Sequence, residues 1–179
     1  TWSLTAHEAR PGHELQFARM IEEGVSNARS VFAFNSANVE GWALYAEAMV
    51  KQYLPLEGQV GTLQMRMMRE ARAFLDPMLN LGMIEPAAVQ AFLMKEVGLS
   101  EPMAKQEVDR YSFRAPGQAT AYFYGYEKQL SLRGRVELAL GDRFDARSYH
   151  DFVLDQGLLP PDLLKEAVMR QYLPSRLKP

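Results

Sequence analysis

Helical periodicity runs through nearly the whole sequence, and prolines or glycines interrupt it at intervals. Asn-Gly and Asp-Gly turns between short alternating apolar runs, which are typical of β-hairpins, do not occur. The pattern therefore predicts an all-α fold without a sheet. The expected helical segments are residues 2–23 with an interruption at 11–12, 39–53, 59–81, 86–98, 100–111, 116–140, 145–157, and a last one from 160.

The length of 179 residues predicts one domain, which we expect to be a single multi-helix unit over residues 1–179. Hydrophobic residues make up 47% and charged residues 23%, which is typical of a globular chain. The sequence begins with threonine rather than methionine. We therefore expect it to be a piece of a longer protein or a processed product. A preceding region could carry an export signal, so the sequence leaves the cellular compartment open.

The charge balance excludes several classes of partner. There are 20 basic and 22 acidic residues, giving a formal net charge of −2, so clustered positive charge for nucleic acid is not expected. No apolar run approaches the ~18 residues that span a bilayer. Cysteine is absent, which excludes disulfides and thiolate metal sites. The oligomeric state is not predictable from these features.

Two of the three histidines, His7 and His13, lie six positions apart, and Glu8 directly follows the first. Zinc peptidases commonly use His-Glu-x-x-His on one helical turn, and this chain lacks that motif. On an unbroken helix, six steps would separate the two rings by about 9 Å along the axis and point them apart. Pro11 and Gly12 are the residues best able to break the helix, and they lie in this gap. The two histidines are therefore either a metal pair across a broken helix or ordinary capping and core residues.

Glu40 and Glu47 lie seven positions apart in the next predicted helix, so both carboxylates face the same way. Two carboxylates on an otherwise apolar face are costly to bury without a cation or hydrogen bonds. One of them can complete a zinc site as the third ligand, and the other can hydrogen-bond a liganding histidine. The alternative for Glu40 is a solvated carboxylate at a helix N-terminus, where the macrodipole favours it.

Tyr122 and Tyr126 share one face of the helix predicted over residues 116–140, whose polar features end at Arg133. A phenol beside a zinc site can donate a hydrogen bond to the oxyanion of a tetrahedral intermediate. The alternative is core packing of the two rings with their hydroxyls at the rim.

Four blocks of the sequence resemble, in order, the bacterial domain of unknown function 885. They are HEARPGHELQ from His7, EGWALYAE from Glu40, PGQATAYFYG followed by LSLR from Pro116, and YHDFVLDQGLLPPDLL from Tyr149. That family is similar to the helical gluzincin metallopeptidases. Its members usually carry a long helical region ahead of the metal motif, so the resemblance implies that this chain is the C-terminal part of a longer helical protein.

The resemblance implies a zinc-dependent, gluzincin-like peptidase. It implies that His7, His13 and Glu40 hold the zinc, that Glu8 activates the water, and that Tyr122 stabilises the oxyanion.

The resemblance also places His150 near the cleft as a further catalytic residue. Glu47 and Tyr126 are expected in supporting or substrate-binding roles. Arg133 either stabilises the fold or binds a peptide carboxylate.

The function expected on these grounds is peptide-bond hydrolysis in the full-length protein, with a peptide as substrate and zinc as cofactor. Two alternatives remain open. One is a non-catalytic helical module that binds no metal, and the other is a metal-dependent amidase or esterase that uses the same residues.

Overall fold

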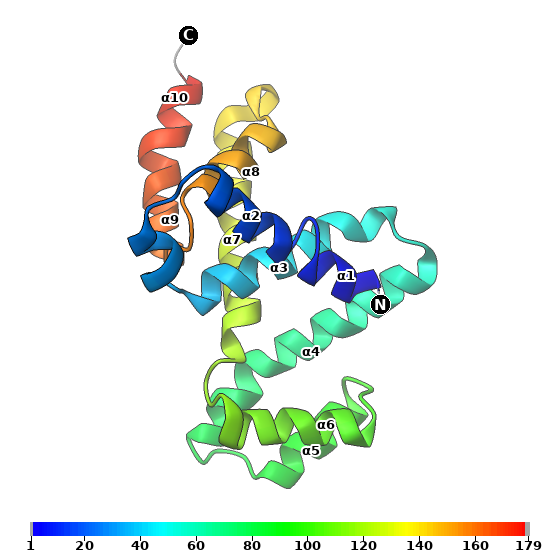
Figure 1. Cartoon of the computed structure of the whole chain (residues 1–179). Coiled ribbons are helices and arrows are strands. Elements are labelled where there is room, and N and C mark those ends of the chain that lie inside the picture. Colours follow the sequence, from blue (N-terminus) through cyan, green and yellow to red (C-terminus); the bar gives the residue numbers. More distant parts are fainter. Residues whose placement is uncertain (1, 178–179) are drawn as a thin grey trace.

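The computed structural model describes residues 2–177, and every regular element within them is helical, which confirms the all-α prediction (Figure 1). The α-helices are α1 (Trp2–Glu8), α2 (His13–Glu22), α3 (Ser36–Val50), α4 (Leu56–Asn80), α5 (Pro86–Lys95), α6 (Glu101–Asp109), α7 (Thr120–Leu140), α8 (Ala146–Asp155), α9 (Pro161–Ala167) and α10 (Leu173–Leu177). Single π-helical turns lie at Ala28–Phe32, Arg110–Arg114 and Val168–Tyr172, and short 3₁₀ turns at Lys51–Tyr53 and Gly141–Arg143.

The predicted interruption between the two N-terminal histidines is confirmed. α1 ends at Glu8 and α2 begins at His13, and the Arg10–Pro11 peptide bond between them is cis. Gly12 packs against the end of α1 so closely that an added Cβ atom would lie 1.8 Å from the carbonyl oxygen of His7. Only glycine fits at this position, so the sequence fixes the path of the chain between the two rings.

Helices α3 and α7 cross in the middle of the molecule (Figure 1) and touch through glycines on both sides. A Cβ atom added to Gly41 would lie 2.6 Å from Cα of Gly125, and one added to Gly125 would lie 1.9 Å from the carbonyl oxygen of Ala37. Because Glu40 precedes Gly41, this close crossing brings the Glu40 carboxylate to the same place as the start of α7.

The apolar core of the described residues has a larger part along α7, a smaller part before the start of α7, and a third, minor part around Met20, Val39 and Leu158. The larger part joins α3, α7 and the C-terminal helices around Trp42, Tyr45 and Tyr149. The smaller part joins α4, α5 and α6, which Figure 1 shows at the other end of the molecule, around Leu75 and Leu93. Helices α4 and α7 contact each other between the two parts, so the described chain forms a single helical domain.

Helix boundaries differ from the sequence prediction mainly at the start of α4 and α7. α4 begins at Leu56, since Pro55 is well tolerated just before a first turn. α7 begins at Thr120 because Gly117, with φ of 80°, places residues 116–119 in a turn. The buried carboxylate of Asp76 accepts hydrogen bonds from the backbone nitrogens of Gly117 and Ala119 at 2.8 and 2.9 Å and holds that turn.

Of the two predicted N-cap residues, Asp145 and Ser100, one makes a capping hydrogen bond and the other does not. Asp145 caps α8 as expected, and its carboxylate accepts from the nitrogen of Ser148 at 2.6 Å. Ser100 stands at the N-cap position of α6, but its hydroxyl makes no capping hydrogen bond. None of the helices in residues 2–177 is both long enough and apolar enough to cross a bilayer, in agreement with the prediction.

Candidate metal centre

His7, His13 and Glu40 converge on one point. Nε2 of His7 lies 3.3 Å from Oε2 of Glu40, and Nε2 of His13 lies 3.5 Å from the same oxygen. The two imidazole rings are perpendicular, with centroids 4.8 Å apart. One donor atom from each of the three residues lies within 4.8 Å of the other two. The break at residues 9–12 makes this possible, because it ends the helical path between His7 and His13 and lets both rings face α3.

These donors fit a zinc ion. Two nitrogens and a carboxylate oxygen at ~2.0–2.1 Å from a tetrahedral zinc would be separated by about 3.4 Å, close to the two measured nitrogen–oxygen distances. Oε2 of Glu40 is buried and has no hydrogen-bond partner of good geometry among the described residues. A buried carboxylate oxygen without a partner is costly, and a cation between the three donors would satisfy it.

Glu47 fixes the orientation of the His7 ring. Its Oε1 lies 2.7 Å from Nδ1 of His7, and the same oxygen accepts from Nη2 of Arg69 at 3.1 Å. Its other oxygen accepts from the hydroxyl of Ser3. Since the Glu47 carboxylate only accepts, Nδ1 of His7 carries a proton, and in the neutral ring the Nε2 lone pair faces Glu40. Zinc-binding histidines are usually held by such a partner.

The charges of this cluster stabilise one another. Burial is the largest influence on His7 and opposes its charged form, but the adjacent carboxylates of Glu40 and Glu47 outweigh it, so the pKa of His7 is raised. Burial also opposes ionisation of Glu40, yet contacts with His13, His7 and Tyr122 together hold the pKa of its carboxyl well below the ordinary range. The carboxylate is therefore ionised at neutral pH, as a metal ligand must be.

His13 is held less firmly than His7. Its Nδ1 is buried and has no hydrogen-bond partner in the part of the chain that the structure describes. The nearest ring after His7 is Phe17, whose centroid lies 6.3 Å away in a tilted arrangement.

Tyr122 lies beside the metal donors. Its ring is nearly parallel to that of His7 at a centroid distance of 6.2 Å, and its hydroxyl interacts with Glu40. The hydroxyl accepts a hydrogen bond from Nη2 of Arg110 at 3.0 Å. The guanidinium of Arg72 lies over the ring, 4.8 Å from its centroid. This environment fixes the phenol next to the carboxylate.

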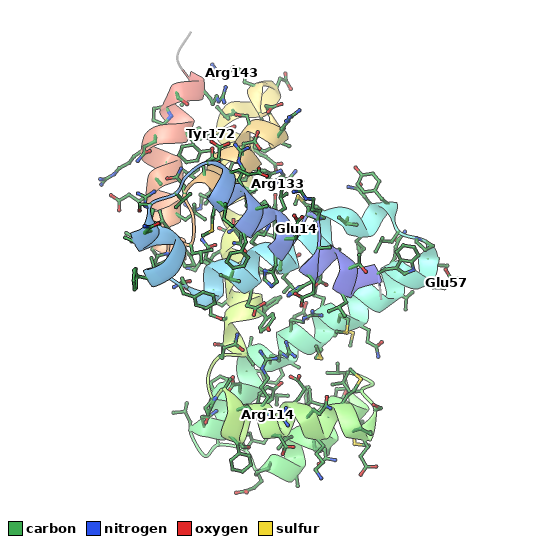
Figure 2. All side chains as sticks on the ribbon, in the orientation of Figure 1. Glu14, Glu57, Arg114, Arg133, Arg143 and Tyr172 are labelled. Atoms are coloured by element: carbon green, nitrogen blue, oxygen red, sulfur yellow. The ribbon has the colours of Figure 1, made fainter. Side chains whose placement is uncertain are left out.

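The remaining predicted site residues do not contact the three donors. Glu8 is exposed at the end of α1 and makes no hydrogen bond or ion pair with another described residue. Tyr126 is buried under Arg66, whose Cζ lies 4.9 Å from the ring centroid. Arg133, labelled in Figure 2, and His150 form a separate group through Tyr45.

Several functional neighbours were not found from the sequence. Arg69, Arg72 and Asp76 are all buried on one face of α4, at spacings of three and four residues. That spacing places the three charged residues on one face, but it does not distinguish a buried face from the usual solvated one. Arg72 meets Glu107 through two hydrogen bonds of 2.7 and 2.6 Å.

The fold and the site together define a helical protein with a candidate two-histidine, one-glutamate metal centre. The chain belongs to the family of bacterial proteins of unknown function DUF885, whose model matches residues 1–168 and so confirms the resemblance. A search of curated proteins found no match.

Two solved structures share this fold. One, a "putative lipoprotein" from Colwellia psychrerythraea, has 33% identity and a TM-score of 0.89 and is matched over 97% of this chain and 30% of its own. The other, a "putative lipoprotein of unknown function" from Shewanella oneidensis, has 26% identity and a TM-score of 0.80 over 93% of this chain and 31% of its own. The chain thus spans less than a third of these relatives.

Proposed function

We propose that the full-length protein is a zinc-dependent peptidase, with the metal held by His7, His13 and Glu40. The observation that carries this proposal is the meeting of these three donors around a buried carboxylate oxygen that lacks a hydrogen-bond partner. Catalytic zinc sites typically use three protein ligands of this kind and keep a fourth position open.

A zinc ion bound there would supply a Lewis acid for the scissile carbonyl and lower the pKa of a water molecule. The chain's own residues provide the rest. Glu47 keeps the Nδ1 proton of His7 in place, so that the ring presents Nε2 to the site. Glu8 adjoins His7 and is exposed. In this proposal it takes the proton from the attacking water and returns it to the departing amine nitrogen.

Tyr122 is the proposed oxyanion donor. Because arginine can only donate, the hydrogen bond from Arg110 uses a lone pair of the Tyr122 oxygen, and the phenol keeps its own proton beside the Glu40 carboxylate. That proton can be given to the developing negative charge of a substrate oxygen. The hydroxyl already lies beside a zinc-ligand candidate, Glu40.

Metal analysis tests the proposal. The full-length protein, purified without chelator, is expected to contain one zinc per chain, and His7→Ala and Glu40→Ala are expected to remove it. Zinc at 100 times its dissociation constant is expected to add about 2.7 kcal/mol to the free energy of unfolding, which a thermal melt with and without chelator detects. Zinc-free full-length protein with an unchanged melt would contradict the proposal and favour the non-catalytic module.

A panel of peptide, amide and ester substrates separates a peptidase from an amidase or esterase.

We propose that the full-length protein is exported from the cytoplasm. Both structural relatives bear the word lipoprotein in their descriptions, and lipoproteins are anchored outside the cytoplasm. Fractionation of cells that express the full-length protein is expected to place it with the envelope, and recovery in the cytoplasmic fraction would contradict this part.

A further inference from the structure

A second candidate site is a cavity of about 490 Å³ between α2, α3 and α8. None of the three metal-ligand candidates lines it. Its apolar lining consists of Pro11, Leu15, Trp42, Met49 and Leu154. The volume falls within the range of ligand-binding pockets. Polar and charged residues complete the lining, namely Arg10, Arg19, Glu22, Arg147, His150 and Asp151.

His150 is a polar group in this lining, and its hydrogen bonds fix which nitrogen carries the proton. Nη1 of Arg133 donates to the hydroxyl of Tyr45 at 2.9 Å, and that hydroxyl lies 2.7 Å from Nε2 of His150. Because the arginine only donates, the hydroxyl keeps its own proton for Nε2, the one acceptor beside it among the described residues. The proton of a neutral His150 ring is therefore on Nδ1.

The Nδ1–H group of His150 is available to a ligand, since it makes no hydrogen bond with any described residue. Burial, together with the nearby charge of Arg133, lowers the pKa of His150 to about 4. The ring is therefore an uncharged donor at neutral pH, suited to a carbonyl oxygen rather than to an anion.

The charges around the cavity also favour an uncharged occupant. Arg10 is paired with Glu14, Arg19 is paired with Glu23 and Asp155, and Nε of Arg147 lies 4.0 Å from a carboxylate oxygen of Asp151. The basic side chains near the opening are thus already matched by acidic ones.

The cavity and the metal centre share the same chain segments. Pro11 lies between the two histidine ligands, and Trp42 follows Glu40 by two residues. Nε1 of Trp42 donates to the carbonyl oxygen of Pro11 at 3.0 Å and ties these segments together. A ligand in the cavity therefore contacts residues that lie two positions from metal-ligand candidates in the sequence.

We propose that this cavity binds a large apolar side chain of a peptide substrate, with His150 Nδ1–H donating to a backbone carbonyl oxygen of that peptide. The identification of the occupant as a peptide rests on the proposed function. In this assignment, His150 is a substrate-binding residue, and Tyr45 and Arg133 are the residues that position it.

Binding of blocked amino acids tests the assignment without any hydrolysis. The probes are N-acetyl-L-phenylalaninamide and N-acetylglycinamide, which share their amide groups and differ in the side chain. With chelator present, the methyl resonances of Met49, Leu15 and Leu154 are followed by NMR during titration. We expect saturable shifts with the phenylalanine probe and at least tenfold weaker binding of the glycine probe, with no shift of the remote Met103.

Two variants test the roles of the donor and of the cavity volume. His150→Phe keeps the shape of the ring and loses the donor, and we expect about threefold to tenfold weaker binding of the phenylalanine probe. Met49→Trp fills the cavity and is expected to abolish binding even if His150→Phe disturbs the fold. Met103→Trp on α6 is the matched control and is expected to bind the probe normally.

Absence of shifts, equal binding of both probes, or unchanged binding by Met49→Trp would overturn the inference. The zinc measurement is independent of this one, because the titration uses chelated protein. A protein that holds zinc but ignores the probe refutes only the cavity assignment, and a protein that binds the probe without ever holding zinc refutes only the peptidase.

Discussion

Nδ1 of His7 lies 2.7 Å from Oε1 of Glu47, although forty positions separate the two residues. Glu47 is 2% exposed, and Arg69 and Ser3 bind its carboxylate as well. A buried carboxylate with three partners is a rigid support, and the ring that it holds presents the opposite nitrogen to Glu40.

Replacing Glu47 tests this support. We expect Glu47→Gln to weaken zinc binding by about 10- to 100-fold, because the ring of His7 loses the acceptor that fixes it. Competition with a coloured chelator measures the affinity. Glu57→Gln, at an exposed position of α4 labelled in Figure 2, is the control and should bind zinc as the parent does. Equal affinities for the two variants would show that His7 needs no such partner.

Gly12 is the residue that allows the chain to turn between the two histidines. Gly12→Ala would place a Cβ atom 1.8 Å from the carbonyl oxygen of His7, so the backbone must shift. We expect a loss of about 2 kcal/mol or more in the free energy of unfolding, measured by urea denaturation, together with loss of zinc. Gly61→Ala in α4 has open space around the new Cβ, so it should be neutral or stabilising. A Gly12→Ala variant with parental stability would refute the close packing.

Gly125→Ala tests the crossing of α3 and α7. The new Cβ would lie 1.9 Å from the carbonyl oxygen of Ala37, so the two helices must separate. We expect a lower melting temperature and weaker zinc binding, because Glu40 lies at this crossing. Gly134→Ala lies on the same helix with nothing within 4 Å of its Cβ. It is expected to raise stability by roughly 0.5–1 kcal/mol, and a similar gain for Gly125→Ala would contradict the crossing.

The buried ion pair between Arg72 and Glu107 predicts that loss of either partner lowers the stability of the fold. Removing the cation in Arg72→Met leaves a buried carboxylate, and we expect a loss of about 3–5 kcal/mol by urea denaturation at pH 7. The exposed pair of Arg170 and Glu166 is the control, and Arg170→Met should cost less than about 1 kcal/mol. Similar costs for the two variants would mean that the inner pair is hydrated.

The same ion pair predicts that the stability of the fold depends on pH. Burial opposes ionisation of Glu107, but hydrogen bonds and charge from Arg72 outweigh it, so the pKa of Glu107 lies below its ordinary value of 4.5. A lowered pKa stabilises the folded state above pH 4.5, and that contribution is lost as the pH falls through the folded-state pKa. The difference in stability between the parent and Arg72→Met is therefore expected to shrink when the measurement moves from pH 7 to below pH 4.

The local features of the site could be predicted from the sequence, whereas its long-range pairings could not. The break at Pro11 and Gly12 and the shared face of Glu40 and Glu47 follow from helix geometry alone. The partner of His150 did not follow, because nothing in the spacing specifies that α8 packs its histidine against Tyr45 of α3.

Buried charges were missed for a related reason. The i, i+3, i+7 pattern of Arg69, Arg72 and Asp76 is visible in the sequence, but it is equally typical of a solvated helix face. Only the tertiary arrangement supplies Glu47, Glu107 and the turn before α7 as their partners. The roles proposed for Glu8, Tyr126 and Arg133 in catalysis or substrate binding stay predictions.

The glycine-to-glycine contact between α3 and α7 has a mechanical consequence. Because Gly41 and Gly125 have no side chains, the two backbones are in direct contact there. Neither helix can shift along its axis without displacing the backbone of the other. Glu40 and Tyr122, each within one turn of that contact, are therefore held at a constant separation by the two backbones themselves.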